Sequence, residues 1–164
     1  MTDTTYDVDV TREFDGPPER VWDAWSTSEG LRSWWGPGPF TCPSAEVDLR
    51  AGGRALLAMR APAEFGGGDT WSTWDFTVVE PLRRIEYVFN FSDADGVRQP
   101  PPIDGVPADG RHEVEITDLG AGRSRIHFVE HGYGTAEARD MSQQGLEACL
   151  DKMAVRVASP AGLT

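Results

Sequence analysis

Residues 111–158 read RHEVEITDLGAGRSRIHFVEHGYGTAEARDMSQQGLEACLDKMAVRVA, and this stretch decides the fold class. In its first half apolar and polar residues alternate, which predicts two strands, Arg111 to Leu119 and Ser124 to Glu130, joined by a turn at Gly120-Ala121-Gly122. From Thr135 to about Ala158 there is no proline and only one glycine. Apolar residues recur there at helical spacing: Leu146, Leu150, Met153 and Val157. A hairpin followed by one long amphipathic helix, with Thr135 as its N-cap, predicts an antiparallel sheet covered on one face by that helix.

The upstream sequence predicts the rest of that sheet. A strand at Tyr6 to Phe14 precedes two short helices, Glu19 to Trp25 and Glu29 to Trp34, and the second ends where Gly36-Pro37-Gly38-Pro39 cannot continue a helix. Four further strands are predicted at Glu46 to Leu49, Arg54 to Ala61, Thr70 to Val79 and Arg84 to Phe91. A long loop, about residues 92–110, then leads to the hairpin, and a loop of that length is usually functional or mobile. We therefore predict one α+β domain over residues 1–164.

The composition excludes several classes of protein. The 164 residues carry 27 Asp+Glu against 15 Lys+Arg, a net charge of −12, so nucleic acid and anionic membrane surfaces are not expected as partners. No apolar run approaches the roughly 18 residues of a membrane span, and the start, MTDTTYDVDV, does not resemble a signal peptide. We therefore expect a cytoplasmic protein in which Cys42 and Cys149 are reduced thiols.

Five motifs, in order along the chain, resemble a known family. They are Val21-Trp22-Asp23-Ala24-Trp25, Leu31-Arg32-Ser33-Trp34-Trp35-Gly36-Pro37, Asp48-Leu49-Arg50-Ala51-Gly52-Gly53, Val79-Glu80-Pro81-Leu82-Arg83-Arg84-Ile85, and Gly145-Leu146 with Leu150-Asp151-Lys152-Met153. The chain resembles the START-like (SRPBCC) superfamily, in the branch named for the activator of heat-shock-protein ATPase homologues. This resemblance implies a helix-grip fold: a curved antiparallel sheet of about six to seven strands wraps the C-terminal helix, with two short helices after the first strand and a cavity between sheet and helix. Leu146 stands where the family usually has a tryptophan, which predicts a wider cavity.

The strand alternation and the helix stripe together predict which residues line that cavity. A curved sheet cannot close fully on a helix that carries small residues such as Cys149, so part of the inward-facing set should border a void. The predicted lining is Trp35, Met59, Trp74, Phe76, Tyr87, Phe89, Phe91, His112, Phe128, Glu130, Leu146, Leu150 and Met153. Trp35 is expected at the mouth, and Trp74 either in the core or in the wall. Glu130 is predicted near the mouth, with Arg139 as a candidate ion-pair partner.

The histidines do not form a metal site in this prediction. His127 and His131 are four residues apart on one strand, which places them about 13 Å from one another, too far to share an ion. His112 is predicted to point inward, without a second histidine beside it. The sequence also has no Gly-x-Ser-x-Gly and no phosphate-binding glycine loop, so we expect no metal, no cofactor and no catalytic residue set.

Three functions remain open at this level. The leading hypothesis is binding of a small apolar molecule, lipid- or polyketide-like, without chemistry. The second, by resemblance to polyketide cyclases and aromatases, is an enzyme that uses His112, Glu130 or Tyr87 as acid or base. The third is a chaperone-interacting module, as the branch name suggests. The relatives also leave a homodimer open.

Overall fold

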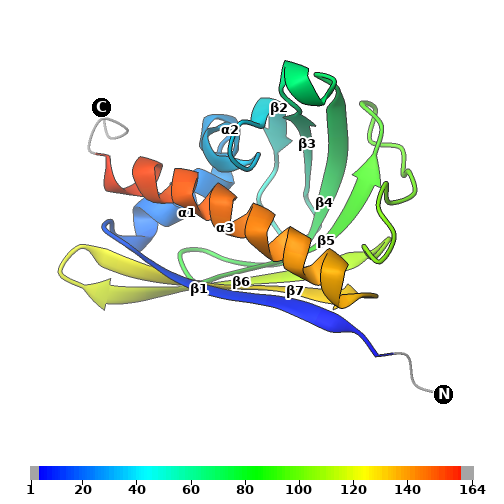
Figure 1. Ribbon diagram of the computed structural model, residues 1–164. Coiled ribbons are helices and arrows are strands. Elements are labelled where there is room, and N and C mark those ends of the chain that lie inside the picture. The colour runs from blue at the N-terminus through cyan, green and yellow to red at the C-terminus, as the bar shows by residue number, and fades with distance from the viewer. Residues whose placement is uncertain (1–3, 160–164) are drawn as a thin grey trace.

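A computed structural model describes residues 4–159 and shows one curved antiparallel sheet with three α-helices (Figure 1). The strands are β1 (Tyr6–Phe14), β2 (Thr41–Val47), β3 (Arg54–Arg60), β4 (Asp69–Glu80), β5 (Arg84–Ser92), β6 (Gly110–Gly120) and β7 (Arg123–Tyr133). The helices are α1 (Pro18–Ser26), α2 (Ser28–Trp34), α3 (Ala136–Ala158) and a short 3₁₀ turn, η1 (Ala63–Phe65). The seven strands follow the order β1-β7-β6-β5-β4-β3-β2, so the α+β helix-grip prediction is confirmed.

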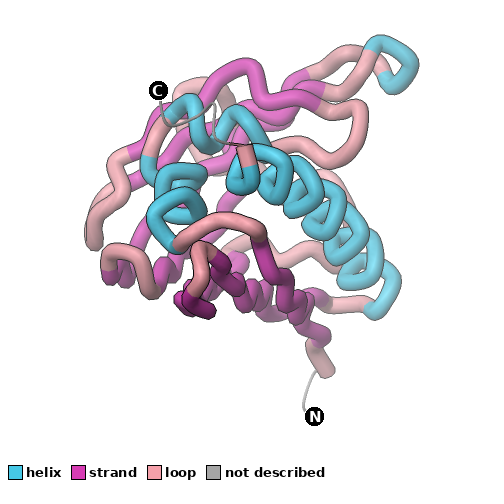
Figure 2. Tube along the Cα trace, turned by 90° about the vertical axis from the view of Figure 1, so that its left-hand side faces the viewer, coloured by secondary structure: helices cyan, strands magenta, loops and turns pink. Residues whose placement is uncertain are grey.

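The sheet curves around α3. Figure 1 shows α3 crossing the concave side of the sheet, and Figure 2 shows strands on both sides of this helix. Register shifts interrupt the β1–β7, β2–β3, β4–β5 and β6–β7 ladders, and such bulges bend a strand and increase its twist. The curvature leaves space between α3 and the middle strands of the sheet.

The long helix forms as its sequence pattern predicts. Its N-cap is Thr135, whose Oγ1 accepts a hydrogen bond of 3.1 Å from the main-chain nitrogen of Ala138. The apolar stripe is buried against the sheet: Leu146, Cys149, Leu150, Met153 and Val157. Burial of this stripe on the concave face, rather than intrinsic propensity, supplies most of the stability of such a helix.

Aromatic rings fill the end of the core that α1 and α2 cover. Trp25 lies 4.8 Å from Trp34, 5.7 Å from Trp74 and 5.9 Å from Tyr87, measured between ring centroids. Trp34 is also held by its indole nitrogen, which donates to the carbonyl oxygen of Ala24 at 2.8 Å. This end is therefore solid core, and the open space lies at the other end of α3.

Some element bounds differ from the prediction. The edge strand β2 begins at Thr41, five residues before the predicted start, and contains Pro43. An edge strand tolerates proline because one side of it needs no ladder hydrogen bond. In addition, β7 continues to Tyr133, beyond the predicted end at Glu130, and this extension shapes the site described next.

Candidate functional site

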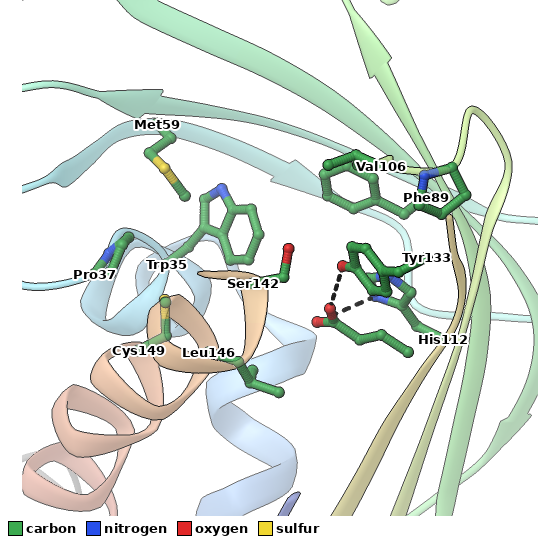
Figure 3. A pocket seen from close by; sticks show the side chains of 13 residues that line it. Trp35, Pro37, Met59, Phe89, Val106, His112, Tyr133, Ser142, Leu146 and Cys149 are labelled. Atoms are coloured by element: carbon green, nitrogen blue, oxygen red, sulfur yellow. Dashed lines mark hydrogen bonds and ion pairs between the residues drawn. The ribbon is translucent and has the colours of Figure 1, made fainter. Parts of the chain in front are cut away.

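A cavity of about 190 Å³ lies between the concave face of the sheet, α3 and the loop of residues 93–109 (Figure 3). The residues that line it are Trp35, Pro37, Met59, Phe89, Val106, Pro107, His112, Glu130, Tyr133, Ser142, Gly145, Leu146 and Cys149. Most of this wall is apolar. Figure 3 shows the polar rings of His112 and Tyr133 together on one side, opposite Trp35, Met59 and Cys149.

The structure brings six of the thirteen predicted residues to the cavity, from six different parts of the fold. They are Trp35 after α2, Met59 on β3, Phe89 on β5, His112 on β6, Glu130 on β7 and Leu146 on α3. The other seven do not line it. Six of them are buried in the core, namely Trp74, Phe76, Tyr87, Phe128, Leu150 and Met153, and Phe91 packs half-buried against that core.

Four side chains form a buried polar cluster at one end of the cavity. The hydroxyl of Tyr133 donates to Oε1 of Glu130 at 2.6 Å. Nδ1 of His112 lies 3.1 Å from the hydroxyl of Tyr87 and 3.9 Å from Oε2 of Glu130. The first His112 distance is a hydrogen bond and the second is too long for one. Oε2 of Glu130, a residue of the cavity lining, therefore has no close protein donor among residues 4–159.

Burial shifts the protonation of this cluster. Loss of solvation raises the pKa of Glu130 from 4.5 to about 7, although the hydrogen bond from Tyr133 opposes the change. The same desolvation, with a smaller contribution from the charge of His131, lowers the pKa of His112 from 6.5 to about 3. The pKa of Tyr87 is raised well above 10, again by burial. Near neutral pH the cavity therefore contains a neutral imidazole beside a carboxyl group that can gain or lose a proton.

A bulge explains why Tyr133 reaches Glu130. Between the pairs Tyr6–Tyr133 and Val8–Glu130, β7 has one more residue than β1. Gly132, at φ 93°, takes up part of this irregularity. Without the extra residue, two positions three apart on a strand would face opposite sides of the sheet. Period-two reasoning cannot find Tyr133 for this reason.

The predicted ion pair between Arg139 and Glu130 is wrong. Nε of Arg139 donates instead to Asp140 at 2.6 Å, and its guanidinium lies 5.6 Å from the ring centroid of Tyr6. The first turn of α3 therefore directs Arg139 over β1, outside the cavity. As a result, no arginine or lysine of the described chain pairs with Glu130.

Two connections hold the cavity wall in place. The loop of residues 93–109 supplies Val106 and Pro107, and it is fixed where the main-chain nitrogen of Gly134 donates to the carbonyl oxygen of Gly105 at 2.7 Å. On the opposite side, Lys152 of α3 donates to the carbonyl oxygens of Gly36 at 2.5 Å and Phe40 at 2.7 Å. The single lysine of the chain thus ties the helix to the loop that carries Trp35 and Pro37.

The remaining histidines lie on the outer face of the sheet. His127 contacts Asp9 at 2.8 Å, and His131 contacts Glu113 at 2.5 Å. Across residues 4–159 no group of three or more His, Cys, Asp or Glu side chains is arranged to hold a metal ion. Nor does this part of the chain contain a helix long and apolar enough to cross a membrane.

Comparisons with known proteins agree with this architecture. A family model described as "Activator of Hsp90 ATPase homolog 1-like protein" matches residues 15–158. Protein CV1439 from Chromobacterium violaceum is 25% identical, with a TM-score of 0.76 over 93% of this chain and 97% of that one. Protein Ms6760 from Mycobacterium smegmatis is 24% identical (TM-score 0.73, 98% and 91% covered), and the AHSA1 protein from Silicibacter pomeroyi is 21% identical (TM-score 0.73, 93% and 98% covered). No curated protein matches the sequence.

Proposed function

Because the chain belongs to the Activator of Hsp90 ATPase homolog 1-like family, within the START-like fold, we propose that its cavity binds a small, mainly apolar molecule. The observation that carries the proposal is a cavity of about 190 Å³ with apolar walls and a polar cluster at one end. A buried, largely apolar cavity with a few convergent polar groups is the usual form of a small-molecule site.

The volume limits the size of the ligand. A dry apolar cavity of about 150 Å³ is enough for benzene, whereas sites for drug-sized ligands have about 300–1,000 Å³. A single-ring molecule therefore suits this cavity, whereas a multi-ring polyketide or a long lipid would exceed its volume. Of the lipid- or polyketide-like ligands expected from the sequence, we therefore propose only the small ones.

Thermal-shift and calorimetric titration with single-ring compounds test the proposal. Leu146→Trp places a large ring in the cavity and should weaken the affinity for these compounds at least about tenfold. Met141→Trp, at a position on α3 that is 47% exposed and outside the cavity lining, is the matched control and should bind as the natural protein does. Equal affinities of both variants, or no binding by the natural protein, would contradict the proposal.

Acid–base catalysis is a second candidate, favoured by the raised pKa of the buried Glu130 beside a neutral His112. Mass-spectrometric monitoring of small polyketide-like substrates should then show turnover that Glu130→Gln removes. An absence of turnover across the panel contradicts it. The chaperone-interacting module and the homodimer stay predictions, which an Hsp90 ATPase assay and sedimentation would test.

A further inference from the structure

The cavity contains a buried carboxyl group with one oxygen available and no positive partner. Glu130 is only 7% exposed. Oε1 accepts the hydroxyl of Tyr133, and Oε2 has no hydrogen bond within the described residues. We propose that the cavity selects a small primary amine carrying one ring, whose ammonium group pairs with Oε2 of Glu130. The inference rests on the proposed function, because it names the ligand class of the same cavity.

The charges around Glu130 favour a cation over an anion or a neutral group. Tyr87 on β5 and His112 on β6 lie beside it, and Ser142 and Cys149 of α3 line the same cavity. None of these groups carries positive charge at neutral pH, since burial lowers the pKa of His112 to about 3. A buried carboxylate without a counter-ion is costly, and a ligand that supplies the counter-ion removes that cost.

The neighbouring strand adds no charge either. On β1 the residue paired with Glu130 is Val8, which is fully buried. The basic side chains of α3 are already held: Arg139 by Asp140, Lys152 by two loop carbonyl oxygens and Arg156 by Asp23. A bound ammonium group would therefore meet no positive competitor at this end of the cavity.

The aromatic wall suits the same ligand. Tyr133 lies at the same end of the cavity as Glu130, and aromatic faces attract ammonium groups through the cation–π interaction. Trp35 and Phe89 add aromatic surface elsewhere in the wall. The remaining wall, with Met59 and Leu146, is apolar and can cover a ring. The net charge of −12 also raises the local concentration of cations at the surface.

Three probes of the same heavy-atom count separate the ligand classes: benzylamine, benzyl alcohol and ethylbenzene. Calorimetric titration at pH 8 should give a dissociation constant for benzylamine at least about tenfold below those of the other two. As the pH falls below about 7, benzylamine affinity should weaken about tenfold per pH unit, because Glu130 must lose its proton before it pairs with the amine. The two neutral probes have no such requirement.

Two variants test whether Glu130 itself produces the preference for the amine. Glu130→Gln should reduce the benzylamine advantage over ethylbenzene to within about twofold. Tyr133→Phe removes the donor that stabilises the carboxylate, so the pH at which benzylamine affinity begins to fall should move upward. Folding of both variants is checked by circular dichroism.

The possible results bear differently on the preference for amines and on ligand binding itself. If all three probes bind alike, or benzyl alcohol binds best, the amine inference fails while the ligand-binding function stands. If benzylamine binds best but Glu130→Gln retains its full advantage, the inference also fails. If none of the probes binds, both the inference and the proposed function are overturned.

Discussion

Replacing Glu130 by glutamine should stabilise the protein above neutral pH and change its stability little near pH 5. Glutamine has nearly the same shape, and its carbonyl oxygen can still accept the hydrogen bond that Tyr133 donates to Oε1 at 2.6 Å. What the substitution removes is the negative charge, which the buried position disfavours.

The magnitude follows from the pKa of Glu130. Burial raises it from 4.5 to about 7, and at roughly 1.4 kcal/mol per pH unit the complete cost is about 3 kcal/mol. In this window the folded protein keeps a proton that the unfolded chain has released, so the free energy of unfolding falls as the pH rises from 4.5 to about 7. The cost is absent below pH 4.5 and complete above pH 7. For a chain of this size about 3 kcal/mol corresponds to a melting temperature higher by roughly 6–12 °C in the variant.

His112 gives the Glu130→Gln variant a second measurable difference, in how its free energy of unfolding depends on pH. Its pKa is lowered from 6.5 to about 3, so its contribution to stability is complete above pH 6.5 and is lost as the pH falls toward 3. Between pH 4.5 and 6.5 this slope opposes that of Glu130, and the pair as a whole holds one proton in both the folded and the unfolded state. The pair should therefore contribute no pH dependence there in the natural protein. In Glu130→Gln only the His112 slope remains, about 1.4 kcal/mol per pH unit.

Urea unfolding at pH 5, 6, 7 and 8 measures both differences. Glu46→Gln, on the exposed face of the edge strand β2, is the matched control for loss of a carboxylate and should show no pH-dependent difference of this size. The reasoning is refuted if Glu130→Gln is less stable than the natural protein at pH 8. It is refuted equally if the difference between them is the same at every pH.

Three further predictions concern a helix-to-loop contact, two glycines and the two thiols. Lys152→Met keeps most of the side-chain length but loses two hydrogen bonds to loop carbonyl oxygens, so urea unfolding should show a loss of about 2 kcal/mol. Gly53→Ala should lower the stability by about 2 kcal/mol in the same assay, since a Cβ there would overlap a main-chain carbonyl oxygen, whereas Gly68→Ala, with open space around it, should cost under about 0.5 kcal/mol. Burial raises the pKa of the Cys42 thiol to about 11 and that of Cys149 to about 12, so iodoacetamide at pH 8 should label neither in the folded protein and both in urea; labelling of the folded protein would contradict their burial.

Period and spacing predicted the fold because they report which side of an element is buried. The stripe from Leu146 to Val157 and the alternation of Ile85, Tyr87 and Phe89 both became the inner faces of their elements. Neither pattern predicts which residues of an inner face lie in the solid core and which border the cavity. Tyr87 stacks on Trp74 with centroids 4.8 Å apart and is solid core, whereas Phe89, two residues on, reaches the cavity.

The parts of the site that sequence reasoning missed depend on irregular backbone. Tyr133 reaches Glu130 only through a bulge, and Val106 and Pro107 reach the cavity from a loop with no period. Arg139 was predicted on the correct helix but is directed over β1, because Asp140 and the ring of Tyr6 offer it partners there. Such positions are decided by contacts between segments far apart in the chain, which no local pattern records.

The position of Glu130 links the stability of the fold to the occupancy of its cavity. The core is already closed by the ring cluster around Trp25, Trp34 and Trp74, so folding does not require a carboxyl group at the other end of α3. Above pH 7 that carboxyl group instead destabilises the empty protein by about 3 kcal/mol. A ligand that neutralises the charge recovers this energy on binding, whereas a neutral ligand of equal size recovers only the apolar contact. The stabilisation produced by an amine should therefore grow as the pH rises toward 7 and level off above it, in step with the cost that Glu130→Gln removes permanently.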